Sequence, residues 1–202
     1  MKVVVIDDDP TGSQAVHSCL LLLRWDVQAL RRGLRHGSPL LFVLADTRSL
    51  TPDAAAQRNR EIVTNLEVAL TEEGLDRSEI QLVSRGDSTL RGHGVVEPAV
   101  LERCFGPFAA TLHVPAFLEG GRTTVNGVHL LHGEPVHTTP FAKDRLFGFS
   151  TSDLSIWLEQ KSAGAICAAD VVKVSLADLD QASAGGMTPL IQRLAALQGN
   201  AT

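Results

Sequence analysis

The sequence is poor in cysteine and has no long apolar run. Its 202 residues include only Cys19, Cys104 and Cys167, which are scattered and odd in number. Their spacing fits neither a zinc site nor a disulfide framework, and it therefore predicts a protein of a reducing compartment. The longest apolar run covers residues 19–23, which is far too short to cross a membrane. No signal-peptide core follows Met1, so we expect a cytoplasmic protein with no membrane partner.

Positive charge is also scarce, and the usual phosphate cradles are missing. The chain has 18 Lys and Arg against 23 Asp and Glu, for a formal net charge of -5. Because no basic stripe is present, we expect no nucleic-acid partner held by phosphate contacts. Neither the G-x-x-x-x-G-K-[ST] spacing of a P-loop nor a G-x-G-x-x-G occurs. His129, His132 and His137 match no common zinc spacing, so we expect no metal site.

Short apolar runs alternate with segments of helical periodicity. This pattern predicts an α/β fold, a three-layer sandwich with a mainly parallel sheet, as a single domain over residues 1–202. The Asn126-Gly127 pair predicts a hairpin turn. Residues 198–202 are short and polar, and we expect them to form a boundary segment outside the sheet. The predicted strands cover residues 3–6, 26–30, 40–45, 80–83, 110–114, 165–169 and 171–174. The predicted helices cover residues 14–23, 51–73, 95–104, 151–161 and 188–197.

Four of the predicted strands end in polar clusters. In parallel α/β sheets, ligands bind outside the carboxyl ends of the strands. If the sheet is parallel, the four clusters meet at one edge, and we expect a single ligand site there. The clusters are Asp7-Asp8-Asp9, Asp46-Thr47-Arg48, residues 85–91 and residues 119–124.

The segment Ser84–His93 holds two arginines, an aspartate, three hydroxyls and two glycines. Arginine offers a planar fork of N–H donors to a carboxylate or phosphate. Aspartate can accept a proton from a sugar hydroxyl, and glycine lets the backbone approach a ligand closely. This mixture predicts a site for a small polyhydroxylated anion. The Gly120-Gly121-Arg122 run adds a candidate backbone nest for an anion, with charge from Arg122.

The triple aspartate admits another interpretation. A hydrophobic strand followed by Asp-x-Asp-x-Thr is typical of haloacid-dehalogenase-like phosphatases, with Asp7 as nucleophile and Asp9 as acid and base. Such enzymes also need a later lysine and a strand ending in two adjacent acids. The later lysines, Lys143, Lys161 and Lys173, are followed by no such strand, which weakens this hypothesis.

With these residues in view, the chain resembles the N-terminal domain of the four-carbon acid sugar kinase family. Order and spacing agree from Val3 to about Val174. Two of the motifs, Asp87-Ser88-Thr89-Leu90-Arg91-Gly92 and Gly120-Gly121-Arg122, are together highly specific. The motifs that carry the resemblance are Asp8-Asp9-Pro10-Thr11-Gly12, Thr47-Arg48-Ser49-Leu50, Asp87-Ser88-Thr89-Leu90-Arg91-Gly92, Pro115-Ala116-Phe117, Glu119-Gly120-Gly121-Arg122-Thr123 and residues 139–144.

The resemblance implies the substrate-binding part of an ATP-dependent kinase that phosphorylates a threonate- or erythronate-like sugar acid. It implies ATP and Mg²⁺ as cofactors, held mainly by a C-terminal ATP-binding domain that this sequence does not include. That domain would act in cis or in trans, and the chain alone would be inactive. A stand-alone sugar-acid binding module without catalysis is the alternative from another class. The resemblance leaves open whether the chain forms a homo-oligomer.

Carried onto this sequence, the resemblance assigns roles to the polar clusters. Arg91 and Arg122 are candidates for the substrate carboxylate or the transferring phosphoryl group. Asp8 and Asp87 are the candidates for the base that acts on the attacking hydroxyl, and the choice between them stays open. The other expected substrate contacts are Asp9, Thr11, Arg48, Arg85, Ser88, Gly120 and Gly121.

Overall fold

The computed structural model describes the backbone of residues 1–202 and all side chains except those of Gln14 and Ala15. The chain divides into two compact units. The first comprises residues 1–87 and 92–107, and the second comprises residues 88–91 and 108–202. The short segment 88–91 is therefore part of the second unit, although both of its flanks belong to the first.

The first unit contains a parallel sheet of four strands in the order β2-β3-β1-β4. The central β1 is built from a β-branched run, and such residues suit a strand that is buried between neighbours. In the register, Asp7 lies opposite Leu44 on one side and Arg85 on the other, so β1, β3 and β4 end at the same edge. The strands are β1 (Lys2–Asp7), β2 (Leu20–Leu22), β3 (Leu40–Leu44) and β4 (Ile80–Arg85).

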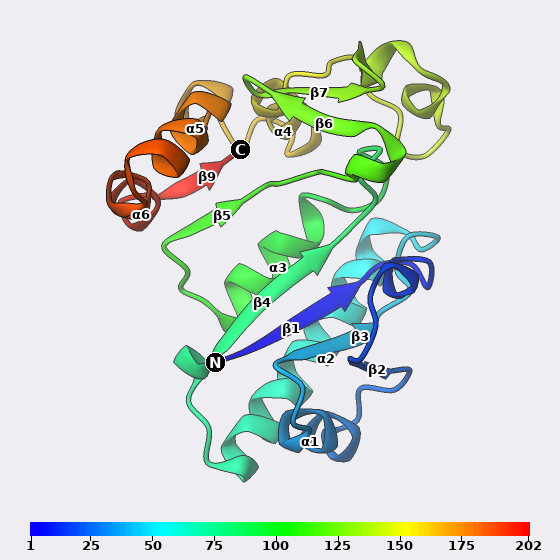
Figure 1. Cartoon of the computed structure of the whole chain (residues 1–202). Helices are drawn as coiled ribbons and strands as arrows, with labels where there is room; N and C mark the ends of the chain where they lie inside the picture. The colour runs from blue at the N-terminus through cyan, green and yellow to red at the C-terminus, as the bar shows by residue number, and fades with distance from the viewer. The chain divides into compact units, whose positions relative to one another are not determined.

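Three α-helices form a single layer in this unit, in which α2 contacts both of the others (Figure 1). The long α2 begins where Thr51 accepts a hydrogen bond from the amide of Ala54 and Pro52 occupies the first turn. It ends at Gly74, whose φ of 67° is in the left-handed region that glycine adopts without strain. The helices are α1 (Val27–Arg35), α2 (Pro52–Glu73) and α3 (Val96–Phe105).

The second unit contains two small sheets. One is a parallel pair, β5 (Ala110–Leu112) with β9 (Gly199–Ala201), and the other is antiparallel, in the order β6-β7-β8. Asn126 and Gly127 both have positive φ, 51° and 78°, as a two-residue type I′ hairpin turn requires. The remaining strands and helices are β6 (Arg122–Val125), β7 (Val128–Leu131), β8 (Glu134–Pro135), α4 (Leu154–Lys161), α5 (Leu176–Gly185) and α6 (Thr188–Ala195).

Short 3-10 helices complete the description. Within the part of the chain that the structure describes, every helix is too short or too polar to span a bilayer. The 3-10 helices are η1 (Gly12–Ala15), η2 (Arg77–Glu79), η3 (Leu118–Gly120), η4 (Val136–Thr138), η5 (Pro140–Lys143) and η6 (Ala168–Asp170).

The predicted α/β class with a mainly parallel sheet is confirmed. The strands predicted at 3–6, 40–45, 80–83 and 110–114 are present, as are the hairpin and the helices at 51–73, 95–104, 151–161 and 188–197. Each of these elements carries its own local signal, such as a β-branched run, a capping residue or a turn pair.

Two predictions in the first 30 residues are wrong. The helix expected over 14–23 is replaced by η1 and by β2, whose three leucines pair in parallel with β3; the side chains of Gln14 and Ala15 lie outside the described set. The strand expected over 26–30 is the start of α1, where Asp26 caps the helix by accepting from the amide of Ala29. A short apolar run does not distinguish helix from strand, and here long-range pairing decides.

Three predictions near the C-terminal end are also wrong. Residues 165–169 form a bend and part of η6 rather than a strand, and α5 was not expected. Residues 171–174 contribute only an isolated bridge between Val172 and Ala201. The expected polar tail instead forms β9, which pairs with β5 across almost ninety positions of sequence. Glycine and asparagine have low strand propensity, so tertiary pairing alone makes this segment a strand.

Candidate functional site

The three aspartates after β1 lie among the loops that follow β3 and β4. The amide of Asp8 donates to the carbonyl of Arg85 (3.1 Å), and the amide of Arg48 donates to the carbonyl of Asp8 (3.1 Å). The parallel register brings these strand ends to one edge of the sheet, as the sequence predicts. The first two polar clusters and residues 85–87 of the third therefore lie together in the first unit. The fourth, residues 119–124, follows β5, which belongs to the second unit and pairs with β9, so the expected meeting of all four at one sheet edge is wrong.

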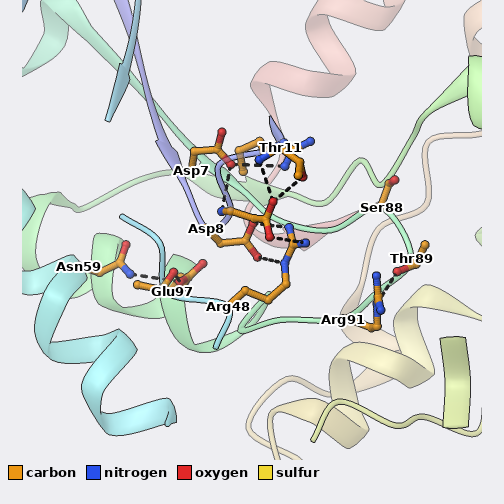
Figure 2. A network of polar contacts seen from close by, with 12 residues as sticks. Asp7, Asp8, Thr11, Arg48, Asn59, Ser88, Thr89, Arg91 and Glu97 are labelled. Carbon is orange, nitrogen blue, oxygen red and sulfur yellow. Dashed lines mark hydrogen bonds and ion pairs between the residues drawn. The ribbon is translucent and has the colours of Figure 1, made fainter. Parts of the chain in front are cut away.

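The guanidinium group of Arg48 holds Asp8 (Figure 2) and also contacts Asp9. Arg48 donates from Nε to Oδ2 of Asp8 (3.0 Å) and from its NH2 nitrogen to Oδ1 of Asp8 (2.7 Å). Its NH1 nitrogen lies 3.1 Å from Oδ2 of Asp9. All three guanidinium nitrogens thus contact these two carboxylates. Such a bidentate pair fixes both orientation and distance, which makes Arg48 a holder of the carboxylates.

The two carboxylates bound by Arg48 differ in their ionisation. Asp8 is 1% exposed, and burial raises its pKa despite the hydrogen bonds from Arg48, with a further rise from the charge of Asp87. Asp9 is less enclosed. Although its burial alone would raise the pKa, hydrogen bonds from the hydroxyl and amide of Thr11 hold it below the usual value, with help from Arg48. Asp9 is therefore the firmly ionised member of this group.

Asp7 is enclosed beneath the loop that follows it. Its Oδ1 lies 3.3 Å from the NH1 nitrogen of Arg85, while its buried Oδ2 has no hydrogen-bond partner among the described side chains. Burial raises the pKa of Asp7. A Cβ at Gly12 would lie 2.3 Å from Arg85 and 2.4 Å from Asp7, so only glycine lets the loop pass this closely.

A second carboxyl network lies beside the aspartates (Figure 2). Glu97, in the first turn of α3, accepts at Oε1 from the hydroxyl of Thr47 and from Nδ2 of Asn59 (3.2 Å). All three residues are buried. Burial raises the pKa of Glu97 to about 7, even though both hydrogen bonds favour ionisation. This carboxyl therefore changes charge near neutral pH.

The second unit presents the segment 88–91, which continues directly from Asp87. Arg91 donates from Nε to the hydroxyl of Thr89 (2.9 Å) and lies 5.0 Å from the ring centroid of Phe141. Leu90, between them, is buried and has a φ of 65°. A buried leucine in the left-handed region is strained, and such strain gathers at functional sites. The segment is thus held in one conformation that orients Arg91.

Arg122 lies near the same aromatic ring as Arg91. Its guanidinium carbon is 5.8 Å from the ring centroid of Phe141 and 5.3 Å from that of Phe117. Its NH1 nitrogen donates to the hydroxyl of Ser88 (3.2 Å), while its buried Nε has no hydrogen-bond partner among the described side chains. Within the described part of the chain, Arg122 forms no ion pair with a carboxylate. The guanidinium groups of Arg91 and Arg122 both lie near the ring of Phe141, and the Nε–H of Arg122 has no acceptor among the described side chains. Such an arrangement suits a bound anion.

His129 supports this arginine-rich segment from β7. Its side chain is fully buried, with Nε2 2.7 Å from the carbonyl of Ser88 and Nδ1 2.9 Å from the hydroxyl of Thr124. Burial, together with the charge of Arg122, lowers the pKa of His129. A neutral ring that donates from Nε2 to Ser88 and accepts from Thr124 satisfies both contacts. His129 is therefore an anchor for the backbone of Ser88.

The backbone-nest interpretation of Gly120 and Gly121 is wrong. The amides of Gly120 and Arg122 donate to the carbonyl of Phe117, and the amide of Gly121 donates to the carbonyl of Leu118. These N–H groups are used within the loop itself, so none is turned toward an anion. The glycines are needed for packing, because a Cβ at Gly121 would lie 2.2 Å from the ring of His132.

Several residues of these clusters were not singled out from the sequence. Glu97 and Asn59 carry no local signal, since helices are rich in such residues. Thr89 and Phe141 lie inside motifs that were quoted for the resemblance, so the motif itself was the available signal. Among the described residues, no group of three or more His, Cys, Asp and Glu is placed to hold a metal ion.

A comparison with protein families bears directly on these clusters. The family model described as a sugar-binding N-terminal domain matches residues 3–201. The chain belongs to this family. The match of the sugar-binding N-terminal domain spans both compact units, and it confirms the resemblance read from the motifs.

Two curated relatives of this sugar-binding domain are kinases. A D-erythronate kinase from Heliobacterium modesticaldum is 28% identical over 151 residues, which are 71% of this chain and 32% of that protein. A D-threonate kinase from Cupriavidus necator is 30% identical over 148 residues, 71% of this chain and 29% of that protein. The chain thus spans less than a third of the length of these relatives.

Solved structures share the fold of the sugar-binding domain. A Bordetella bronchiseptica protein, solved as a domain-swapped dimer with bound citrate, has a TM-score of 0.70 at 24% identity over 100% of this chain and 46% of its own. A Haemophilus influenzae protein has a TM-score of 0.68 at 14% identity, covering 98% of this chain and 47% of its own. At these identities the likeness establishes the fold alone.

Proposed function

We propose that the chain is the substrate-binding part of an ATP-dependent kinase that phosphorylates a four-carbon sugar acid of the threonate or erythronate type. The observation that carries this proposal is the pair of guanidinium groups on the ring of Phe141. Arg122 has a buried Nε without a partner among the described side chains, and Arg91 is oriented by Thr89. A carboxylate is the group that such a pair of forks binds with both geometry and charge matched. The kinase relatives support the same substrate class.

Of the two candidate bases, we assign the role to Asp87. Asp8 is almost fully buried, and Arg48 already binds both of its oxygens. Asp87 is half-buried and lies close enough for its charge to raise the pKa of Asp8. Phosphoryl transfer depends mostly on positioning and charge stabilisation, so a carboxylate of ordinary basicity suffices to receive the hydroxyl proton.

ATP and Mg²⁺ are not matched by the described residues. The sequence has no P-loop spacing, and Arg48 and Thr11 already contact the oxygens of Asp8 and Asp9. We therefore derive no step through the nucleotide or the metal. We propose that both are bound mainly by a separate ATP-binding domain, in cis or in trans, whose closure excludes water from the phosphoryl group.

The relatives favour neither alternative, and the geometry of Asp7 argues against the phosphatase. The phosphatase hypothesis requires an accessible nucleophile at Asp7, yet this side chain is fully buried and lies against Arg85 beneath Gly12. A stand-alone binding module would explain Arg91 and Arg122 equally well, but the curated relatives are kinases.

Calorimetric titration of this chain with D-threonate and D-erythronate tests the proposal. We expect binding to the wild type and a loss of about 2–5 kcal/mol on replacing Arg122 or Arg91 by alanine, because each would remove a buried charge-assisted contact. Arg60→Ala, an exposed arginine on α2, is the matched control. Unchanged affinity in both variants would remove these arginines from the site.

A second experiment separates the kinase from the binding module. Mixed with an ATP-binding domain of a relative, the wild-type chain should transfer phosphate to the acid that it binds. Asp87→Asn should abolish transfer while retaining binding, since the amide cannot take up the hydroxyl proton. A chain that binds the acid and still transfers no phosphate with several such domains would favour the binding module.

A further inference from the structure

The loop that carries Arg48 is connected to the start of α3 by two buried side chains. Glu97 accepts from the hydroxyl of Thr47, the residue before Arg48. His93 lies with Nε2 3.0 Å from the carbonyl of Leu50, two residues after Arg48. Glu97 and His93 are four residues apart, and the amide of Glu97 donates to the carbonyl of His93 (3.0 Å). The loop is thus held on both sides of Arg48 by one short stretch of chain.

The contact at Thr47 is the part of this arrangement that is costly to bury. Thr47, Asn59 and Glu97 are all buried, and a carboxyl group placed away from water destabilises the fold unless donors compensate it. Asn59 donates to the same oxygen of Glu97 and also to the carbonyl of Ala55. A well-packed apolar side chain at position 97 would avoid this penalty. The network therefore serves a purpose other than stability alone.

The residue that follows Thr47 is Arg48, whose side chain needs a fixed backbone. Arg48 must keep its three guanidinium nitrogens on Asp8 and Asp9, at distances between 2.7 and 3.1 Å. A long flexible side chain does this only if its own backbone is fixed. The amide of Arg48 is bound to the carbonyl of Asp8, and the hydroxyl of Thr47 is fixed by Glu97. The chain is therefore restrained immediately before the Arg48 Cα.

We infer that Glu97 is a positioning residue, which acts through Thr47 to hold Arg48 in its three-nitrogen contact with Asp8 and Asp9. This inference rests on the proposed function for its meaning, because Asp9 is one of the expected substrate contacts. Glu97 itself has no contact with a reacting group. The charged groups that face it are Arg48 and Asp8, both of which influence its ionisation.

Hydrogen exchange at the Nε–H of Arg48, followed by isotope-edited NMR, tests the inference without any ligand. Thr47→Val keeps the shape of the side chain and removes the hydroxyl, so we expect exchange about tenfold faster than in the wild type. Thr47→Ser restores the donor and should exchange at the wild-type rate. Glu97→Ala should resemble Thr47→Val, while Glu97→Gln, which keeps an accepting oxygen, should resemble the wild type.

A destabilised control separates positioning from general loosening. Ile62 is fully buried in α2, and Ile62→Val lowers stability without touching the loop. We expect this variant to leave the exchange rate at Arg48 unchanged. If Thr47→Val and Glu97→Ala lower the melting temperature as Ile62→Val does, and Arg48 exchanges at the wild-type rate in all of them, Glu97 is only a structural residue and the inference is overturned.

A binding measurement links the inference to the proposed function and keeps their failures apart. Titration with D-threonate should show affinity about tenfold weaker in Thr47→Val than in Thr47→Ser, because Asp9 would be less well fixed. Faster exchange with unchanged affinity would overturn the link between Arg48 and substrate. A wild-type chain that binds no sugar acid would overturn the proposed function, and the exchange rates would then decide the positioning role alone.

Discussion

Replacing Glu97 by glutamine isolates the ionisation of one buried carboxyl. Burial raises the pKa of Glu97 from 4.5 to about 7, against the hydrogen bonds from Thr47 and Asn59 that favour the charged form. In the unfolded chain the carboxyl ionises near its ordinary value. Between the two values the folded chain therefore holds a proton that the unfolded chain has lost, and the free energy of unfolding falls as the pH rises.

The magnitude follows from the two pKa values. The difference between 4.5 and about 7 corresponds to about 3 kcal/mol, since a tenfold change in an ionisation constant is worth about 1.4 kcal/mol. The penalty is absent at low pH, where both states are protonated, and complete once the pH exceeds the folded pKa. Glutamine keeps an accepting oxygen and cannot ionise. We expect the stability advantage of Glu97→Gln over the wild type to grow by about 2–3 kcal/mol as the pH rises from about 5 to about 8.

Urea unfolding followed by circular dichroism measures this gain at each pH. Glu61→Gln is the matched control, because Glu61 is exposed on α2, and its pH profile should run parallel to that of the wild type. Subtracting the wild-type profile removes the contributions of Asp7 and Asp8, whose pKa values are also raised. Parallel profiles for the wild type and Glu97→Gln would refute the reasoning, since the carboxyl would then ionise alike in both states.

Three further substitutions test local features of the fold by urea unfolding. Gly121→Ala should cost about 1–3 kcal/mol, because φ is 68° there and the added Cβ would meet His132; a neutral result would mean that the ring has room to move. Asp26→Ala should cost about 1 kcal/mol by leaving the amide of Ala29 unbound at the start of α1, and a cost near zero would show that the cap is not used. Two arginines hold the pKa of Glu73 at about 2, so Glu73→Gln should be less stable than the wild type at neutral pH, and this difference should vanish as the pH falls from about 4 toward 2. A difference that persists at low pH would point to packing instead.

The elements that could be read from the sequence are those whose signal is local. The β-branched run of β1, the Thr51-Pro52 start and Gly74 end of α2, and the Asn126-Gly127 turn each lie within a few residues. The parallel sheet then brings the ends of β1, β3 and β4 to one edge, as the general rule for such sheets predicts. The motifs also led to the correct family, because several specific motifs seldom occur in a fixed order by chance.

The errors arose where pairing over long distances overrides local preference. The leucines of β2 would suit a helix, and β9 holds glycine and asparagine, yet each is a strand because β3 or β5 supplies its hydrogen bonds. The expected anion nest failed for a related reason. Its amides bind carbonyls of the same loop, and no pattern of residue types reveals how a loop satisfies its own backbone groups.

The amino-acid sequence by itself therefore determined which chemistry is present: carboxylates, arginines and hydroxyls placed after strands, with glycines where the chain must pass closely. Only the tertiary structure decided how these groups are used. It joins Arg48 to Asp8 and Asp9, Glu97 to Thr47, and two arginines to the ring of Phe141. The physical reason is that hydrogen bonding and burial depend on distance in space, and residues fifty positions apart come within reach only once the chain has folded.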